Sequence, residues 1–228
     1  MNTRGLLDQL LKSGQQLLNK QPASGQPSGN AGGLGGLLSG AGGGALAAGA
    51  IGLLLGNKKA RKYGGKVLTY GGLAALGVLA YKAYGNWQAS QGAGQGAEPQ
   101  TLDRLPAPQA EQHSQAVLRA LVAAAKADGH IDERERALIE GEFTRLDNDR
   151  ELQHWLHDEL NKPLDPAEVA RAAQTPEMAA EMYLASVMMV DQENFMERAY
   201  LDELARQLRL EPALRQELEA QVRLAAGQ

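Results

Sequence analysis

The chain has 228 residues, a formal net charge of -4 and no cysteine, which excludes disulfides, thiolate catalysis and metal sites held by cysteine. The charge is unevenly divided: residues 1–100 carry nine Lys or Arg against two Asp or Glu, and residues 101–228 carry fourteen against twenty-five. The basic half suits an anionic lipid surface and the acidic half suits water. No basic, aromatic-rich face indicates nucleic acid as a partner.

Residues 1–20 predict an amphipathic helix. Its leucines cluster on one helical face, at Leu6, Leu7, Leu10, Leu11, Leu17 and Leu18. Such a helix lies on a membrane surface or binds a partner. Charges interleaved with these leucines do not form the pattern of a secretory signal peptide. Residues 21–30 follow as a linker rich in Pro, Gly and Ser.

Residues 31–85 predict a membrane segment. Residues 31–56 contain no charge, and a span needs about 20 apolar helical residues, so we expect one span at 34–56. Small residues recur there at every fourth position: Gly32, Gly36, Gly40, Gly44, Ala48, Gly52 and Gly56. This spacing lets a second helix approach closely in lipid, which favours a homo-oligomer held by a glycine zipper. A flexible low-complexity arm is the alternative for the first half.

A second, shorter apolar run lies between Lys66 and Lys82. Snorkelling of these lysines would let residues 66–82 span the membrane as the second half of a helical hairpin, with interfacial anchors at Tyr63, Tyr70, Tyr81, Tyr84 and Trp87. The alternative is a helix on the bilayer surface. The basic residues 58–66 should stay cytoplasmic, so a single span leaves the amino terminus outside and the carboxyl-terminal domain in the cytoplasm, whereas a hairpin leaves both termini outside. We favour the single span.

Residues 86–108 predict a flexible linker, and residues 109–226 a compact all-α bundle. Three helix starts carry capping signals: Asp132 with Glu135, Asp165 with Glu168, and Thr175 before Pro176. We expect seven helices, near 110–127, 132–147, 149–160, 166–173, 176–190, 195–208 and 212–225. Their apolar faces predict a core that includes Val117, Leu118, Leu121, Val122, Leu138, Ile139, Phe143, Leu146, Trp155, Leu156, Leu160, Tyr183, Leu184, Val187, Met188, Tyr200, Leu201, Leu204 and Leu208.

The bundle contains an internal repeat. Residues 121–128 align with 184–191, and residues 135–139 align with 197–201. Each copy reads as a helix, an acidic turn and a second helix. This pattern predicts a pseudo-twofold arrangement with the two acidic turns at equivalent positions.

The first turn belongs to the run Ala125-Lys126-Ala127-Asp128-Gly129-His130-Ile131-Asp132, followed by Glu135. This run resembles the signature of the tellurite-resistance TerB-like helical domain, and residues 197–205 resemble its counterpart. The Gly-rich amino-terminal half joined to this domain resembles the YebE-type inner-membrane proteins of Gram-negative bacteria. The YebE resemblance implies no enzyme activity, and the TerB-like resemblance implies cation binding by carboxylates and a membrane-associated interaction role in stress response.

Carried onto this chain, the TerB-like resemblance implies a metal site at Asp128, Asp132, Glu135, Asp191, Glu193 and Glu197. Calcium and magnesium prefer such oxygen ligands. An EF-hand is excluded, because the twelfth position counted from Asp128 is Ile139. Helix capping and ordinary turn chemistry are the alternative roles for these carboxylates. His154 and His157 have a spacing that could hold zinc, but we expect them on a solvated helix face.

Motifs for a catalytic serine, a phosphate loop or a dinucleotide site do not occur, so we do not expect an enzyme. We expect a membrane-anchored interaction or sensor module that contacts lipid and a protein partner and responds to a divalent cation. The alternative is a structural membrane protein that homo-oligomerises through its glycine zipper.

Overall fold

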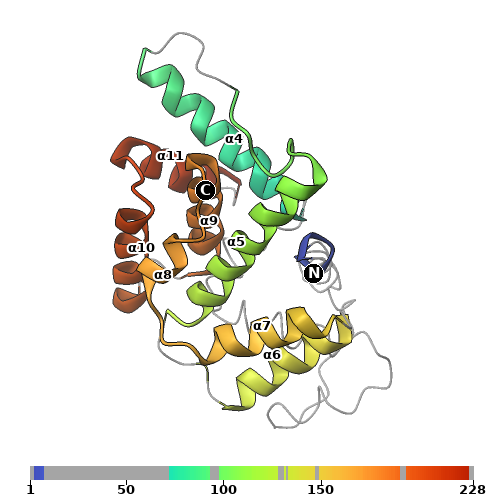
Figure 1. Cartoon of the computed structure of the whole chain (residues 1–228). Coiled ribbons are helices and arrows are strands. Elements are labelled where there is room, and N and C mark those ends of the chain that lie inside the picture. Colours follow the sequence, from blue (N-terminus) through green and yellow to red (C-terminus); the bar gives the residue numbers. More distant parts are fainter. Residues whose placement is uncertain are drawn as a thin grey trace, which may run out of the picture.

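The structure is a computed structural model that describes residues 3–7, 72–92, 98–127, 131, 133–146, 149–190 and 194–225. Within these ranges the chain is all-α and contains no strand. A short helical segment covers residues 3–7. The later helices are α4 (Gly72–Ser90), α5 (Ala107–Ala125), α6 (Glu133–Leu146), α7 (Arg150–Asn161), α8 (Pro166–Ala170), α9 (Pro176–Met189), α10 (Phe195–Gln207) and α11 (Pro212–Ala225). Figure 1 shows their arrangement.

The seven helices expected from residue 110 onward are all present, with ends within about three residues of the expected ones. Two of the expected caps are confirmed. The carboxylate of Asp165 accepts the backbone N–H of Ala167 at 2.9 Å, and the hydroxyl of Thr175 accepts that of Met178 at 3.1 Å. The expected cap at Asp132 lies outside the described residues.

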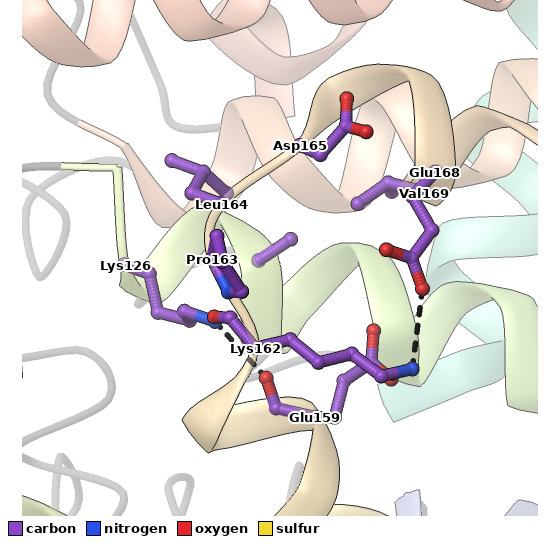
Figure 2. Close-up of a pocket in the computed structure, with 9 residues that line it drawn as sticks. Lys126, Glu159, Lys162, Pro163, Leu164, Asp165, Glu168 and Val169 are labelled. Carbon is purple, nitrogen blue, oxygen red and sulfur yellow. Dashed lines mark hydrogen bonds and ion pairs between the residues drawn. The ribbon is translucent and has the colours of Figure 1, made fainter.

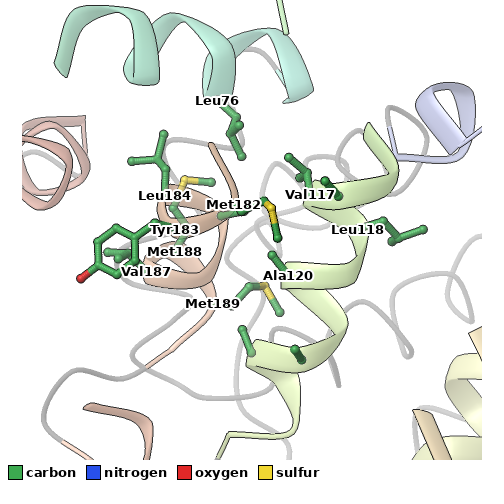
Figure 3. Packing of buried hydrophobic residues seen from close by; sticks show 14 of the residues in the cluster. Leu76, Val117, Leu118, Ala120, Met182, Tyr183, Leu184, Val187, Met188 and Met189 are labelled. Carbon is green, nitrogen blue, oxygen red and sulfur yellow. The ribbon is translucent and has the colours of Figure 1, made fainter. Parts of the chain in front are cut away.

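The helices α5 and α9 form the centre of the core and the most extensive helix pair. Every side chain from Met178 to Met189 on α9 is buried, as expected for a helix that is apolar on all sides. Figure 3 shows Leu184 of α9 toward Leu76 of α4, and Met182 and Met189 toward Val117 and Ala120 of α5. Of the expected core residues whose side chains are described, Leu121 and Trp155 are partly buried and the others are fully buried.

The two copies of the predicted repeat differ in their packing. Its two first helices, α5 and α9, pack on each other. Its second helices have different neighbours, because α6 packs on α7 whereas α10 packs on α8 and α9. The two acidic turns, at 128–132 and 191–193, lie largely outside the described residues, so their equivalence stays a prediction.

The helix α4 covers most of residues 66–82, for which the sequence left open a second membrane crossing or a helix on the bilayer surface. It packs on α11 and α9 inside the domain, with Leu76, Leu79, Ala80 and Ala83 buried. Its apolar run of about 14 residues is short for a bilayer and typical of a helix that faces a protein core. No helix in the described ranges combines the length and apolar character that crossing a membrane requires. The zipper positions Gly32 to Gly56 lie outside those ranges.

The aromatic residues of α4, expected as membrane anchors, make contacts within the protein. The rings of Tyr84 and Trp87 meet edge to face with their centroids 5.1 Å apart. The guanidinium of Arg104 lies 3.9 Å from the centroid of the Tyr81 ring. Tyr63 and Tyr70 are outside the described residues.

Residues 98–106 form a packed connection, which we call the strap, where we expected a flexible linker over 86–108. Thr101 and Leu102 in the strap are buried. Gly77 of α4 lies so close to the strap that a Cβ atom there would be 2.8 Å from the backbone nitrogen of Asp103. The folded domain therefore begins no later than α4.

Candidate docking site

The amino-terminal segment 3–7 is docked on the helical domain. Leu6 and Leu7 are 1% and 0% exposed and belong to the same apolar core as α5 and α9, whereas Arg4 is exposed. Figure 1 places this segment beside α5 and near α7. Within residues 3–7 the two leucines therefore face protein, and the amphipathic helix expected over 1–20 stays a prediction.

Glu111 of α5 holds the start of this segment. Its Oε1 accepts the backbone N–H of Thr3 at 2.6 Å, and its Oε2 accepts that of Arg4 at 3.1 Å. The first N–H groups of a helix have no partner within the helix, so a carboxylate at this position satisfies them. The buried leucines and this cap together define what we call the amino-terminal seat.

A groove of about 320 Å³ continues from the seat. It lies between the start of the segment, α5, α7 and the loop after α8, and is lined by Thr3, Gln112, Gln115, Ala116, Leu118, Arg119, Leu152, Trp155, Ala172 and Gln174. The groove combines buried apolar side chains, Leu118 and Leu152, with exposed carboxamides. This combination suits a peptide, because the peptide's apolar side chains can pack on Leu118 and Leu152 while its backbone groups hydrogen-bond with the carboxamides.

Two buried polar atoms in the groove lining, Thr3 Oγ1 and Arg119 Nε, have no hydrogen-bond partner among the residues that the structure describes. Arg119 Nε lies 3.3 Å from Glu159 Oε1, which is close enough for an ion pair but does not meet the angle of a hydrogen bond. The Arg119 guanidinium carbon is also 5.8 Å from the Trp155 ring centroid. Neither atom is exposed, so the hydrogen-bonding groups that the groove presents to a ligand are its exposed carboxamides, Gln112, Gln115 and Gln174.

A buried carboxylate joins α9, α5 and the strap. Glu181 is 0% exposed; its Oε1 accepts the backbone N–H of Leu102 at 2.5 Å, and its Oε2 lies 2.5 Å from Nδ1 of His113. Burial raises the pKa of Glu181 above its usual range, and the contacts with His113 and Leu102 offset part of this rise. The pair is closed to solvent, so its role is to position the strap.

A second ionic cluster joins the ends of α5, α7 and α8, as Figure 2 shows. The ammonium of Lys126 donates to the carbonyl oxygens of Glu159, at 3.0 Å, and of Lys162. The ammonium of Lys162 lies 3.2 Å from the carboxylates of both Glu159 and Glu168. Partial burial lowers the pKa of Lys126. The pocket among these residues has room for about one water molecule, so the cluster ties helix ends together.

The predicted metal site lies largely outside the described residues. Asp128, Asp132, Asp191 and Glu193 lie outside the described residues, and the side chain of Glu135 in α6 is not among those described. Glu197 is buried in the first turn of α10. Among described side chains, no three His, Asp or Glu residues are grouped so as to hold a metal ion.

The two histidines of α7 are exposed, as expected. His157 Nδ1 lies 2.8 Å from Glu140 Oε1, and His154 Nε2 lies 3.7 Å from Asp158 Oδ2. Each histidine is therefore placed beside a carboxylate on the surface of the domain.

Sequence reasoning missed the residues that build the seat and the buried pair. Glu111 and Thr3 are 108 positions apart, and nothing local to either indicates the contact. Glu181 did leave a signal, since it is the one charge in the run from Met178 to Val190. A lone carboxylate in such a run indicates a buried group with a partner.

The described part of the chain thus defines an all-α domain with a docked amino-terminal segment. Residues 40–222 match the family described as "Protein of unknown function (DUF533)", and the chain belongs to this family. It is also 34% identical over 113 residues to a Yersinia enterocolitica protein described as "Uncharacterized protein in ampR 5'region". That match covers 50% of this chain and 81% of the relative. No solved structure matches the chain.

Proposed function

We propose that this protein is a membrane-anchored, non-enzymatic interaction module whose helical domain binds a short leucine-bearing helix. The observation that carries the proposal is the seat: Leu6 and Leu7 are fully buried, and Glu111 binds the backbone of Thr3 and Arg4. Backbone recognition by a carboxylate and burial of two adjacent leucines are general features of helix docking. The groove beside the seat adds surface for a longer peptide.

The anchor in this proposal is the uncharged segment 31–56 in the bacterial inner membrane. Its support is the length of the apolar run and the resemblance to YebE-type inner-membrane proteins. The basic residues 58–66 favour a cytoplasmic position for the domain. A TerB-like fold, a stress-related role and a calcium or magnesium response through the acidic turns stay predictions from that resemblance.

Peptide binding to the full-length protein in detergent tests the interaction role. A Leu6→Asp, Leu7→Asp variant should leave its own seat empty, and a Trp87→Phe change leaves Trp155 as the fluorescent reporter, since the chain has two tryptophans. We expect a peptide of residues 1–20 to shift Trp155 emission saturably. A matched peptide carrying the two aspartates should give no shift. Absence of saturable binding at millimolar peptide would contradict the proposal.

A second pair of variants locates the binding surface. Gln115→Phe places a bulky side chain on the groove rim without adding a tryptophan, whereas Gln109→Phe makes the same change on an exposed position of α5 outside the groove lining. We expect only the first to weaken binding of the peptide. If both variants weakened peptide binding equally, the peptide would bind outside the groove.

The alternative function, a structural protein that homo-oligomerises through its zipper, makes a different prediction. A Gly40→Leu, Gly44→Leu variant should then lose chemical crosslinking between copies in membranes. Peptide binding at the seat should survive this change if the domain acts as an interaction module.

A further inference from the structure

We propose that the amino-terminal segment is a tethered inhibitor of the seat, so that a partner helix binds only after displacing this chain's own residues 3–7. The inference rests on the proposed function and adds its regulation. Leu6 and Leu7 already lie in the apolar core, and Glu111 already accepts the backbone N–H groups of Thr3 and Arg4. A partner that needs the same carboxylate and the same apolar surface cannot bind while the segment is docked.

The segment occupies both parts of the seat. Each carboxylate oxygen of Glu111 accepts one N–H of the segment, at 2.6 Å and 3.1 Å. Leu6 and Leu7 are 1% and 0% exposed, so the apolar surface that they cover has no room for two more side chains. The groove beside Thr3 is open, but its lining includes neither Glu111 nor the surface under the two leucines. Binding of a partner at the seat and docking of the segment are therefore mutually exclusive.

Release of the segment leaves the centre of the domain in place. The most extensive helix pair, α5 and α9, is made by helices other than the segment. Glu111 lies near the start of α5 and is only partly buried, so water can hydrate its carboxylate when the segment leaves. The seat can therefore empty by local opening, which needs less free energy than unfolding of the whole domain.

The covalent link makes the segment a persistent competitor. Residues 8–71 join it to α4 of the same folded domain, so its local concentration does not fall when the protein is diluted. This effective concentration is about millimolar for a short tether and falls as the tether lengthens. A partner has to exceed it in binding strength. The groove beyond the seat, lined by Leu118 and Leu152, offers a longer partner the additional contacts that displacement requires.

Binding of a labelled peptide to the full-length protein in detergent tests the proposal. The peptide carries residues 1–20 with fluorescein at its carboxyl end, and its anisotropy is measured against empty micelles, the native chain, a Leu6→Asp, Leu7→Asp variant and Arg4→Asp. Arg4→Asp is the matched control, because it makes the same change in net charge on an exposed side chain and keeps the backbone bond to Glu111. We expect the double variant to bind the peptide roughly tenfold more tightly than the native chain. Arg4→Asp should bind it like the native chain.

Association kinetics test the native chain without any change at the seat. Since residues 3–7 have to leave first, the observed rate of peptide binding should level off as the peptide concentration rises, because opening of the seat becomes limiting. A rate that keeps rising in proportion to the peptide concentration would contradict the inhibitor, whether or not the double variant folds.

The affinities separate this proposal from the proposed function. Equal affinity of the native chain and the double variant would overturn the inhibitor and leave the interaction role intact. Equal tightening in Arg4→Asp would assign the effect to charge and overturn the inhibitor as well. Inhibition that disappears when the native protein is diluted would show that a second copy supplies the segment, which contradicts a tether within one chain. Absence of saturable binding to all three proteins would overturn the inhibitor together with the proposed function.

Discussion

Gly77 of α4 lies directly against Asp103 of the strap, and a Cβ atom at Gly77 would stand 2.6 Å from the Asp103 Oδ1 and 2.8 Å from its backbone nitrogen. The second distance involves backbone, which cannot rotate away as a side chain does. The close approach lets Leu102 reach Glu181 while Arg104 covers Tyr81. A single glycine thus sets how closely the strap lies on α4.

Gly77→Ala should therefore destabilise the domain. Forcing an extra carbon into this contact should lower the free energy of unfolding by about 1–3 kcal/mol, measured by urea denaturation of the full-length protein in detergent. Gly85→Ala is the control, because a Cβ atom there meets nothing within 4 Å. That change should raise stability by up to about 1 kcal/mol through helix propensity. If both substitutions changed the free energy of unfolding equally, the strap would be able to move away from α4 without cost, which would contradict this prediction.

Glu181→Gln should remove a pH dependence of stability. In the unfolded chain the Glu181 carboxyl has a pKa of about 4.3, and burial raises that pKa in the folded protein. Between these two values the folded state binds more protons, so the free energy of unfolding of the native sequence falls as pH rises. Glutamine keeps an oxygen that accepts the Leu102 N–H and carries no titrating proton.

Thermal unfolding from pH 4 upward checks this sign. The difference in stability between Glu181→Gln and the native sequence should shift in favour of the variant as pH increases. Glu177→Gln makes the same substitution earlier on α9, on a side chain that is only partly buried. If both substitutions removed the pH dependence of the free energy of unfolding equally, the effect would come from net charge and not from the buried Glu181.

Glu111→Ala should loosen the amino-terminal segment without unfolding the domain. Loss of the two bonds to Thr3 and Arg4 costs about 1 kcal/mol, which corresponds to roughly fivefold faster local opening. Hydrogen exchange at the amides of residues 3–7 measures this opening. Gln109→Ala, on an exposed position of the same helix, should leave exchange unchanged. Unchanged exchange in Glu111→Ala would show that the leucines alone hold the segment.

Lys126→Met should destabilise the junction of α5 and α7. The ammonium satisfies carbonyl oxygens at the end of α7, and methionine fills similar volume without a donor. We expect a loss of about 1–3 kcal/mol in unfolding experiments. Lys82→Met, on an exposed position of α4, is the matched control and should change stability little. An equal loss in the control would contradict this role.

The sequence predicted the bundle well because the signals for its helices are local. Asp165 and Thr175 mark helix starts by side-chain chemistry alone, and the apolar run from Met178 identifies a buried helix. The position of α4, in contrast, is not specified by any local signal in its own sequence. A short apolar helix satisfies either a bilayer or a protein core, and only the partner surfaces on α9 and α11 decide between them. The seat depends in the same way on Thr3 and Glu111, which are distant in sequence.

The pairing of α4 with α11 brings the first and last helices of the domain together. Asn86 donates to Glu217 at 2.6 Å across this contact, and Gln91 donates to Glu211 at 3.4 Å. A polypeptide still emerging from the ribosome cannot make this contact until α11 is complete. The face of α4 that packs on α11 consequently lacks its partner until α11 has been synthesised, and removal of α11 would expose that face while α4 keeps its contact with α9.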